Sequence, residues 1–409
     1  MTKKRYIFLV LILGSLTALG PFSIDMYLPG FPAIAKSLHT TTAQVSLTLS
    51  GYFIGISVGQ LLYGPLLDRF GRKKPLYIGL VLYIIASISC FFVTSIHQLI
   101  VLRFFQAVGS CAASVAAITT VRDVFPVKDN ARVFALLILV LSVSPMLAPT
   151  LGGYVTTYWG WPFIFLILTC IAILMLIMVI FFLPENYKPD KSYSLKPLPI
   201  INSFWSVMKQ PQFFTYALCG AIAFSCLYTY LASSPIVFME LYHVKSQVYG
   251  WIFAMLAAGY IGASQLNGIL TRRFQSEQIV KFSLPALAII TLIFLAGSVT
   301  NVLGLYGTIV MVFLLLCCIG ITYPNTSALS LAPFSKNTGT AASLMGALQM
   351  SVGTLVSVLV SFYKSHSTIP MSGLMATAAL LALLILIIGR QRMAKPVKAE
   401  TEEALGVHS

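Results

Sequence analysis

The strongest constraint in this sequence is a series of long apolar runs that fills nearly the whole chain. A helix needs about 20 apolar residues to cross a bilayer, whereas membrane strands are segments of about 10 residues with alternating polarity. The runs are long and not alternating, so we predict an all-α polytopic membrane protein. Its twelve expected transmembrane helices lie at 6–36, 43–66, 75–95, 98–122, 132–155, 161–183, 213–237, 248–270, 279–299, 303–326, 338–363 and 371–389.

Composition narrows the classes of protein that such a chain can form. Hydrophobic residues make up 58% of the chain and charged residues 9%, whereas soluble globular proteins carry about 25% charged residues. So few charges cannot cover a soluble surface, which excludes a cytosolic enzyme, a secreted disulfide-linked module and a disordered protein. The seven cysteines lie within apolar runs and lack metal-site spacing, so we interpret them as packing residues.

The basic residues follow the positive-inside pattern of membrane proteins. With a cytoplasmic N-terminus, the inner segments hold 22 Lys and Arg residues and the outer segments hold three, namely Lys36, Lys245 and Lys364. This split predicts that both termini are cytoplasmic. The first run continues to Leu28, beyond the length of a signal peptide, so we expect an uncleaved first span. The net charge of +15 is spread in small clusters between spans, which argues against a nucleic-acid partner.

The longest inner connection is rich in Pro, Lys and Ser and divides the spans into two sets of six. The expected domains are an N-terminal bundle at 1–183, a cytoplasmic linker at 184–212, a C-terminal bundle at 213–392 and a cytoplasmic tail at 393–409. The two halves also echo each other, because Gly64-Pro-Leu-Leu-Asp-Arg-Phe is followed 204 residues later by Gly268-Ile-Leu-Thr-Arg-Arg-Phe. This similarity favours an internal six-helix repeat.

Two charged residues lie well inside apolar runs, where a charge costs about 2.5–3.5 kcal/mol on insertion scales. Asp25 is the only such acid and Arg103 the only such base, and both lie toward the outer part of their spans. One interpretation is a buried structural ion pair. The functional interpretation is that Asp25 takes up and releases protons while Arg103 adjusts its affinity for them. Pro21, Pro29 and Pro32 flank Asp25 and predict an irregular helix at this point.

The loop after the second span combines charged residues with glycines. Asp68 stands at the C-terminal end of a helix, where a negative charge is disfavoured, so it gains from pairing with Arg69 or Arg72. Gly64 and Gly71 permit close helix approach and a tight turn. Taken alone, this loop is explained by a basic anchor on the inner side of the membrane.

Two further patterns place small residues within spans. Arg103-Phe-Phe-Gln-Ala-Val-Gly lies in the fourth span, and Ala148-Pro149-Thr-Leu-Gly152-Gly153 lies in the fifth. Small residues there allow close backbone contact, and Pro149 frees a carbonyl group and kinks its helix. Ordinary small-residue packing is the alternative explanation.

These patterns together resemble the major facilitator superfamily. The loop around Asp68 resembles the hallmark cytoplasmic loop of that family. The Arg103 pattern resembles its Arg-x-x-Gln-Gly motif, with Ala107 in place of Gly. The Pro149 pattern resembles its antiporter motif, with Ala148 in place of the first Gly.

A branch within the family, the Bcr/CflA drug:proton antiporters, is indicated by several segments spread over the chain. The segments that resemble this branch are Asp25–Ile34, Val121–Asp123, Tyr323–Leu329, Gly339–Leu344 and Gln349. The resemblance implies proton-driven export of small drugs, as in bicyclomycin- and chloramphenicol-type efflux proteins. It also implies two six-helix bundles around a central cavity.

Roles for individual residues follow as expectations. We expect proton coupling by Asp25 and Arg103, and helix packing by Pro149, Gly152 and Gly153. The expected conformational switch comprises Gly64, Asp68, Arg69, Gly71, Arg72, Arg122 and Asp123. Polarity alone suggests the expected substrate-cavity residues, which are Tyr228, Tyr230, Asn325 and Gln349. A solvated helix-end pair at Arg122 and Asp123, and ordinary packing roles for the four cavity residues, are open alternatives.

The energy source and the partners are also constrained. The chain has no Walker-type phosphate loop, so we expect protons as the coupling ion and no other cofactor or metal. The expected partners are small drugs or metabolites, protons and the lipid bilayer, with no nucleic acid, for a monomer in the bacterial inner membrane. Two alternatives stay open: proton-coupled export of an endogenous metabolite, and an uncoupled facilitator, which has no need of an intramembrane acid. An enzyme is not expected, because the spans hold no paired carboxylates and no His/Cys cluster.

Overall fold

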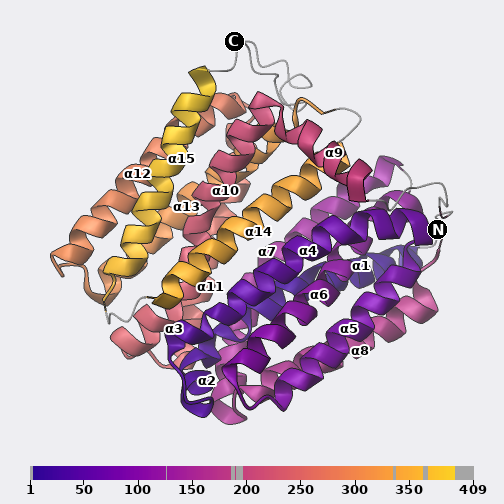
Figure 1. The fold of residues 1–409 in the computed structure, drawn as a ribbon, viewed down its shortest axis with the longest axis horizontal. Coiled ribbons are helices and arrows are strands. Elements are labelled where there is room, and N and C mark those ends of the chain that lie inside the picture. The colour runs from indigo at the N-terminus through magenta and orange to yellow at the C-terminus, as the bar shows by residue number, and fades with distance from the viewer. Residues whose placement is uncertain are drawn as a thin grey trace. The chain divides into compact units, whose positions relative to one another are not determined.

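The computed structural model describes residues 3–125, 127–185, 189, 197–334, 338–362 and 367–391 (Figure 1). Within these ranges the regular elements are all helical, and twelve helices are long and apolar enough to cross a membrane. Each predicted span overlaps one of these twelve, with ends that agree within five residues. The predicted fold class, an all-α protein with twelve transmembrane helices, is therefore confirmed.

The chain folds into two compact units. The first unit is Met1–Leu195 with Val244–Ala254, and the second unit is Lys196–His243 with Met255–Ser409. Helix α11, Ser246–Leu270, therefore starts in the first unit and ends in the second. The boundaries predicted from sequence, 1–183 and 213–392, stay a prediction, and the predicted tail at 393–409 lies outside the described residues.

The first unit is built around α6. Its elements are α1 (Lys3–Asp25), the 3-10 turn η1 (Leu28–Gly30), α2 (Phe31–Ser37), α3 (Thr42–Val45), α4 (Leu47–Phe70), α5 (Lys73–Phe91), α6 (Ile96–Val124), α7 (Val127–Tyr158) and α8 (Pro162–Phe182). Helices α1, α4 and α5 all pack against α6. A Cβ atom on Gly55 of α4 would lie 2.4 Å from the backbone oxygen of Phe104 in α6, so glycine is what allows these helices to approach so closely.

The first span is broken at Asp25, as its prolines predict. Helix α1 contains Pro21 and ends at Asp25, and the 3-10 turn and α2 then complete the span to Ser37. A proline cannot donate the backbone hydrogen bond that continues a helix. The break therefore places Asp25 where one helical segment stops and the next has not begun.

The second unit is built around α10. Its elements are α9 (Pro197–Met208), α10 (Pro211–Ser234), the π-helical segment η2 (Pro235–Leu241), the later part of α11, α12 (Ser276–Val299), α13 (Gly304–Leu331), α14 (Thr338–Phe362) and α15 (Ile369–Gln391). Helices α13, α14 and α15 pack on α10, and α12 packs on α13 and α15.

Helix α9 was not anticipated, because the segment 184–212 was interpreted only as a linker. The helix starts at Pro197, a residue suited to a first helical position. Its Val207 is fully buried in a cluster with Phe213, Ala217 and Ala341. A single apolar anchor of this kind fixes a short helix to the second unit.

Candidate functional site

Arg103 is the most completely buried charged residue described in the first unit. Its exposed fraction is 0%. Its Nη1 donates to Oε1 of Gln106 at 2.5 Å, and its Nη2 donates to the backbone oxygen of Ser23 at 2.8 Å. The guanidinium carbon also lies 4.3 Å from the ring centroid of Tyr27 and 4.2 Å from that of Tyr52. The buried cation is thus stabilised by neutral acceptors and aromatic faces.

The two residues that accept hydrogen bonds from Arg103 are themselves fixed by hydrogen bonds to α5. Gln106 donates from Nε2 to the hydroxyl of Ser87 at 2.7 Å, which fixes its carbonyl oxygen toward Arg103. The hydroxyl of Ser23 is 2.6 Å from that of Tyr83, so the residue that accepts from Arg103 is itself tied to α5. These contacts join α1, α5 and α6 around one positive charge, whose Nε is buried without a hydrogen-bond partner among the described residues.

Asp25 is buried, with 5% of its surface exposed, but it does not form an ion pair with Arg103. Among the described residues, its carboxyl group has neither an ion-pair partner nor a hydrogen-bond partner. Arg103 is bound instead to the backbone oxygen of Ser23 and to the side chain of Gln106.

Arg103 instead contacts the residues on either side of Asp25. It binds Ser23 two residues before Asp25 and packs on Tyr27 two residues after it. A third contact comes from α7, where a Cβ atom on Gly152 would lie 1.7 Å from the backbone oxygen of Met26. The break in the first span is therefore held from two sides, with the carboxyl group of Asp25 between the held residues.

Pro149 and Gly153 of α7 pack against the part of α11 that belongs to the first unit. A Cβ atom on Gly153 would lie 2.6 Å from the backbone oxygen of Ser246, and one on Gly250 would lie 2.8 Å from that of Pro149. Thr150 also donates its hydroxyl to the backbone oxygen of Gly250 at 3.3 Å. The small residues expected to serve helix packing thus lie at backbone-to-backbone contacts.

Arg72 is the centre of a charged cluster at one end of the first unit. Its Nη1 lies 2.9 Å from Oδ1 of Asp68, and its Nε lies 2.7 Å from Oδ2 of Asp123. Burial disfavours the charged guanidinium, but the two hydrogen-bonded carboxylates outweigh this, so the pKa of Arg72 lies above its ordinary value. The cluster ties α4, the start of α5 and α6 together.

This cluster refines the expected conformational switch. Of the two candidate partners of Asp68, the structure selects Arg72, whereas Arg69 stacks over Phe70 at 5.7 Å. Asp123 joins the same cluster, although the sequence offered only a possible pair with Arg122. The side chain of Arg122 lies outside the described residues.

The two glycines of this loop differ. Gly71 has φ of +87°, so it supplies the tight turn that was expected of it. Gly64 does not provide the expected close helix approach, because a Cβ atom on it would meet nothing within 4 Å among the described residues. The glycines of α4 that face α6 recur every four residues from Gly51 to Gly59, and Gly64 is off that face.

Sequence reasoning missed Glu185 at this end of the unit. Its Oε1 accepts a hydrogen bond from the backbone N–H of Lys73 at 3.5 Å. A Cβ atom on Gly71 would lie 2.6 Å from the same oxygen. Glu185 follows α8 in an irregular segment, so neither its spacing nor its surroundings in the sequence could have marked it.

In the second unit, Tyr228 and Gln349 belong to one aromatic cluster, which we define as Phe224, Tyr228, Tyr260, Tyr323 and Gln349. The ring of Phe224 lies 4.5 Å from that of Tyr323 and 5.3 Å from that of Tyr228. The hydroxyl of Tyr323 donates to Oε1 of Gln349 at 2.9 Å. Tyr323 and Gln349 also line a small hollow between α10, α13 and α14.

The other two expected cavity residues lie elsewhere. Asn325 donates from Nδ2 to Oδ1 of Asn267 at 2.6 Å and to the backbone oxygen of Ile321 at 2.8 Å. Tyr230, 1% exposed, is two residues from Tyr228 and so lies on the opposite face of α10. Asn325 therefore fits the alternative of a satisfied packing group, while Tyr228 and Gln349 share the aromatic cluster.

The chain belongs to the Major Facilitator Superfamily, whose family model matches residues 13–361. It is 30% identical over 386 residues to the uncharacterized MFS-type transporter YdgK of Bacillus subtilis, covering 94% of this chain and 95% of the relative. It is 28% identical over 382 residues to a bicyclomycin resistance protein homolog of Haemophilus influenzae, covering 93% and 96%. It is 27% identical over 373 residues to the multidrug resistance protein MdtL of a Shewanella species, covering 90% and 92%.

Solved structures with the same fold are also membrane transporters. A bacterial homolog of the lysosomal transporter Spinster gives a TM-score of 0.74 at 14% identity, covering 96% of both chains. A D-xylose-proton symporter gives a TM-score of 0.71 at 12% identity, covering 97% of this chain and 99% of the other. The protein is therefore a multi-pass membrane transporter of small molecules, and the prediction that it is not an enzyme is confirmed by its family.

Proposed function

We propose that this protein is a drug:proton antiporter that exports small drug-like molecules across the bacterial inner membrane. Its termini are cytoplasmic, it works as a monomer, and protons are its coupling ion with no other cofactor. The similarity to a bicyclomycin resistance protein homolog and to a multidrug resistance protein supports the substrate class. The 22 to three split of basic residues supports the topology.

The observation that carries the proposal is the carboxyl group of Asp25. It is buried at a break in a spanning helix, without a hydrogen-bond or ion-pair partner among the described residues. An ionised carboxylate in such a place is costly, so a group kept there without a permanent partner is available to bind and release a proton. A break in the helix lets a small backbone movement change the side from which that proton arrives.

Arg103 is the positioning residue of this site. It binds the backbone of Ser23 before Asp25 and the ring of Tyr27 after it, and it leaves the carboxyl group itself unpaired. A permanent ion pair between the two residues would hold Asp25 in its charged form and would oppose proton binding. In this arrangement Arg103 holds the residues on either side of Asp25 and leaves the carboxyl group free to exchange protons.

The Arg72 cluster serves the change of conformation. It joins three helices of the first unit through one shared guanidinium, so breaking either contact releases one helix end. Its residues lie at or just beyond the ends of spanning helices, away from Asp25. We assign it to the balance between conformations, and not to drug binding.

Transport in reconstituted vesicles tests the proposal. Asp25→Asn should lose drug-dependent proton movement and uphill drug transport, while Asp25→Glu, which keeps a carboxyl group, should retain part of both. The drugs would first be chosen by susceptibility of a pump-deficient bacterial host that expresses the protein. Uphill transport by Asp25→Asn at the parent rate would overturn the role of Asp25, and downhill transport without proton movement by the parent would indicate an uncoupled facilitator.

A further inference from the structure

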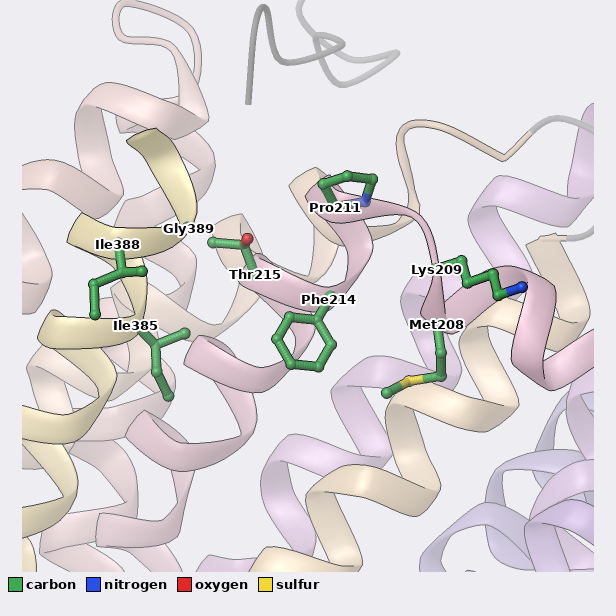
Figure 2. A pocket seen from close by; sticks show the side chains of 8 residues that line it. All are labelled: Met208, Lys209, Pro211, Phe214, Thr215, Ile385, Ile388 and Gly389. Atoms are coloured by element: carbon green, nitrogen blue, oxygen red, sulfur yellow. The ribbon is translucent and has the colours of Figure 1, made fainter. Parts of the chain in front are cut away.

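A cavity lies on the second unit where α9, α10 and α15 meet. It measures about 310 Å³ and is lined by Met208, Lys209, Pro211, Phe214, Thr215, Ile385, Ile388 and Gly389. Figure 2 shows the ring of Phe214 in the middle of the view, with Ile385 and Ile388 of α15 on one side and Met208 of α9 on the other. None of these residues belongs to the site, the cluster or the switch described above.

The walls of the cavity are apolar and open to the surroundings. Phe214 is 46% exposed and Ile388 is 44% exposed, both within spanning helices. Exposed apolar side chains on a spanning helix contact lipid chains and not water. Gly389 has no side chain, which lets α15 approach α10 closely. A Cβ atom at this position would lie 2.3 Å from Cγ2 of Thr215. The volume is at the lower end of the range of about 300–1,000 Å³ typical of small-molecule sites.

One basic residue lies at the rim. Lys209 is exposed, and its Nζ lies 5.8 Å from the ring centroid of Trp205. It takes no part in the ion pairs found among the described residues. Arg390, which follows the lining residue Gly389, is instead bound to Glu277 at 2.6 Å. The rim thus offers one positive charge that has no counter-charge among the described residues, next to an apolar cavity.

Helix α9 has the character of a helix that lies in the membrane interface. Trp205 is 62% exposed, whereas Val207 is fully buried against the second unit. An exposed tryptophan beside a lysine is typical of segments at the level of lipid headgroups. The cavity therefore lies at the depth where a headgroup and the start of its acyl chains meet.

We propose that this cavity binds an anionic phospholipid of the inner leaflet, with an acyl chain over Phe214 and Ile388 and its phosphate group near Lys209. The acyl chain of the lipid supplies apolar surface that matches the cavity walls, and its anionic headgroup supplies a counter-charge for Lys209. A zwitterionic phospholipid offers the same chain without net charge and should bind more weakly. The leaflet assignment rests on the topology proposed above.

Lipid retention by the purified full-length protein tests this proposal. Native mass spectrometry would compare phosphatidylglycerol with phosphatidylethanolamine of the same acyl chains, added at equal concentration in detergent. The parent protein should retain phosphatidylglycerol preferentially. Lys209→Gln should weaken phosphatidylglycerol binding about fivefold and leave phosphatidylethanolamine binding unchanged.

A matched pair of variants on α15 tests the walls. Ile388→Trp fills the cavity and should weaken binding of both lipids, whereas Ile387→Trp, at a neighbouring residue that is 50% exposed and not part of the lining, should not. Equal retention of the two lipids by the parent, or equal losses in the two tryptophan variants, would overturn the proposal. Because no readout depends on drug transport, failure of the antiport experiment leaves this result unaffected, and the reverse also holds.

Discussion

The two units place polar groups inside their helices in different ways. The first unit buries a full positive charge on Arg103 and a carboxyl group on Asp25 within its spans. The buried polar pairs described in the second unit are neutral, among them Asn267 with Asn325 and the partly buried Tyr323 with Gln349. A neutral pair costs less to bury than a charge, but it cannot exchange a proton or sense a membrane potential. Proton coupling is therefore a property we expect of the first unit, and selection by shape and hydrogen bonding a property of the second.

The ion clusters near helix ends differ between the two units in the sign of the central residue. In the first unit Arg72 is shared by Asp68 and Asp123. In the second unit Glu277 is shared by Arg390 at 2.6 Å and Lys281 at 3.4 Å. Removal of the central charged residue abolishes both contacts of its cluster, whereas removal of one outer residue leaves the other contact in place. The central residues are thus the positions at which the two units are best compared.

The largest effect is expected from Arg103→Lys. Lysine keeps the charge but lacks the planar fork that binds Gln106 and Ser23 together and stacks on two rings. Transport should fall to background, and the free energy of unfolding should drop by at least about 2 kcal/mol. Vesicle transport and thermal unfolding in detergent measure the two effects. The same change at the partly exposed Arg390 of the second unit is the control, and a parent-like Arg103→Lys protein would refute the positioning role.

A smaller effect is expected at the ion clusters. Arg72→Gln should slow transport about tenfold, the factor that corresponds to ~1.4 kcal/mol, because it releases both carboxylates. Asp68→Asn should slow it less and should leave equilibrium drug affinity within a few-fold of the parent. Glu277→Gln in the second unit should change the transport rate little. Rate and binding measurements on the three variants decide this, and a loss of drug binding in folded Asp68→Asn would count against a switch.

The asparagine pair of the second unit should affect stability and not coupling. A double-mutant cycle of Asn267→Ala and Asn325→Ala should give a coupling free energy of about 1 kcal/mol, typical of a neutral buried hydrogen bond. Drug-dependent proton movement per drug transported should stay unchanged. A changed proton-to-drug ratio in either variant would mean that the second unit takes part in coupling.

The smallest effect is expected from Tyr323→Phe. The substitution removes the hydroxyl group that donates to Gln349 and keeps the ring that packs on Phe224. Drug affinity should change by only a few-fold, since one neutral hydrogen bond contributes about 0.5–1.5 kcal/mol. Phe224→Ala, which removes a ring from the aromatic cluster, should weaken binding more. If both variants bind drug as the parent does, the aromatic cluster does not contact the substrate.

The spans could be predicted from sequence because hydrophobic length is a local property of the chain. The break at Asp25 was also predictable, since it follows from nearby prolines. The second partner of Arg72 was not, because Asp123 is 51 residues away and pairs through tertiary packing. Helix α9 was missed because its flanking prolines and polar residues resemble those of a linker.

The sequence identified the residues of the candidate site but not the contacts between them. Polarity within a span identified Asp25 and Arg103, but only the packing of α1 on α6 decides that the backbone of Ser23, and not the carboxyl group of Asp25, binds the guanidinium. Polarity likewise selected Tyr228 and Tyr230 together, although a separation of two residues places them on opposite faces of one helix. Tyr323 belongs to the Tyr323–Leu329 segment that resembles the Bcr/CflA branch. Phe224 carries no polar group, so only its aromatic ring could mark it in the sequence.

The fit of Gly152 against Met26 has a consequence for how this sequence can vary. A Cβ atom at Gly152 would overlap the carbonyl group of Met26, the residue after Asp25, whereas one at Gly64 would meet nothing within 4 Å among the described residues. In a library of variants selected on a toxic drug, surviving clones should keep glycine at position 152 and accept alanine, serine or larger residues at position 64. The surviving sequences would show which glycines of the family motifs this protein needs for function and which it can lose.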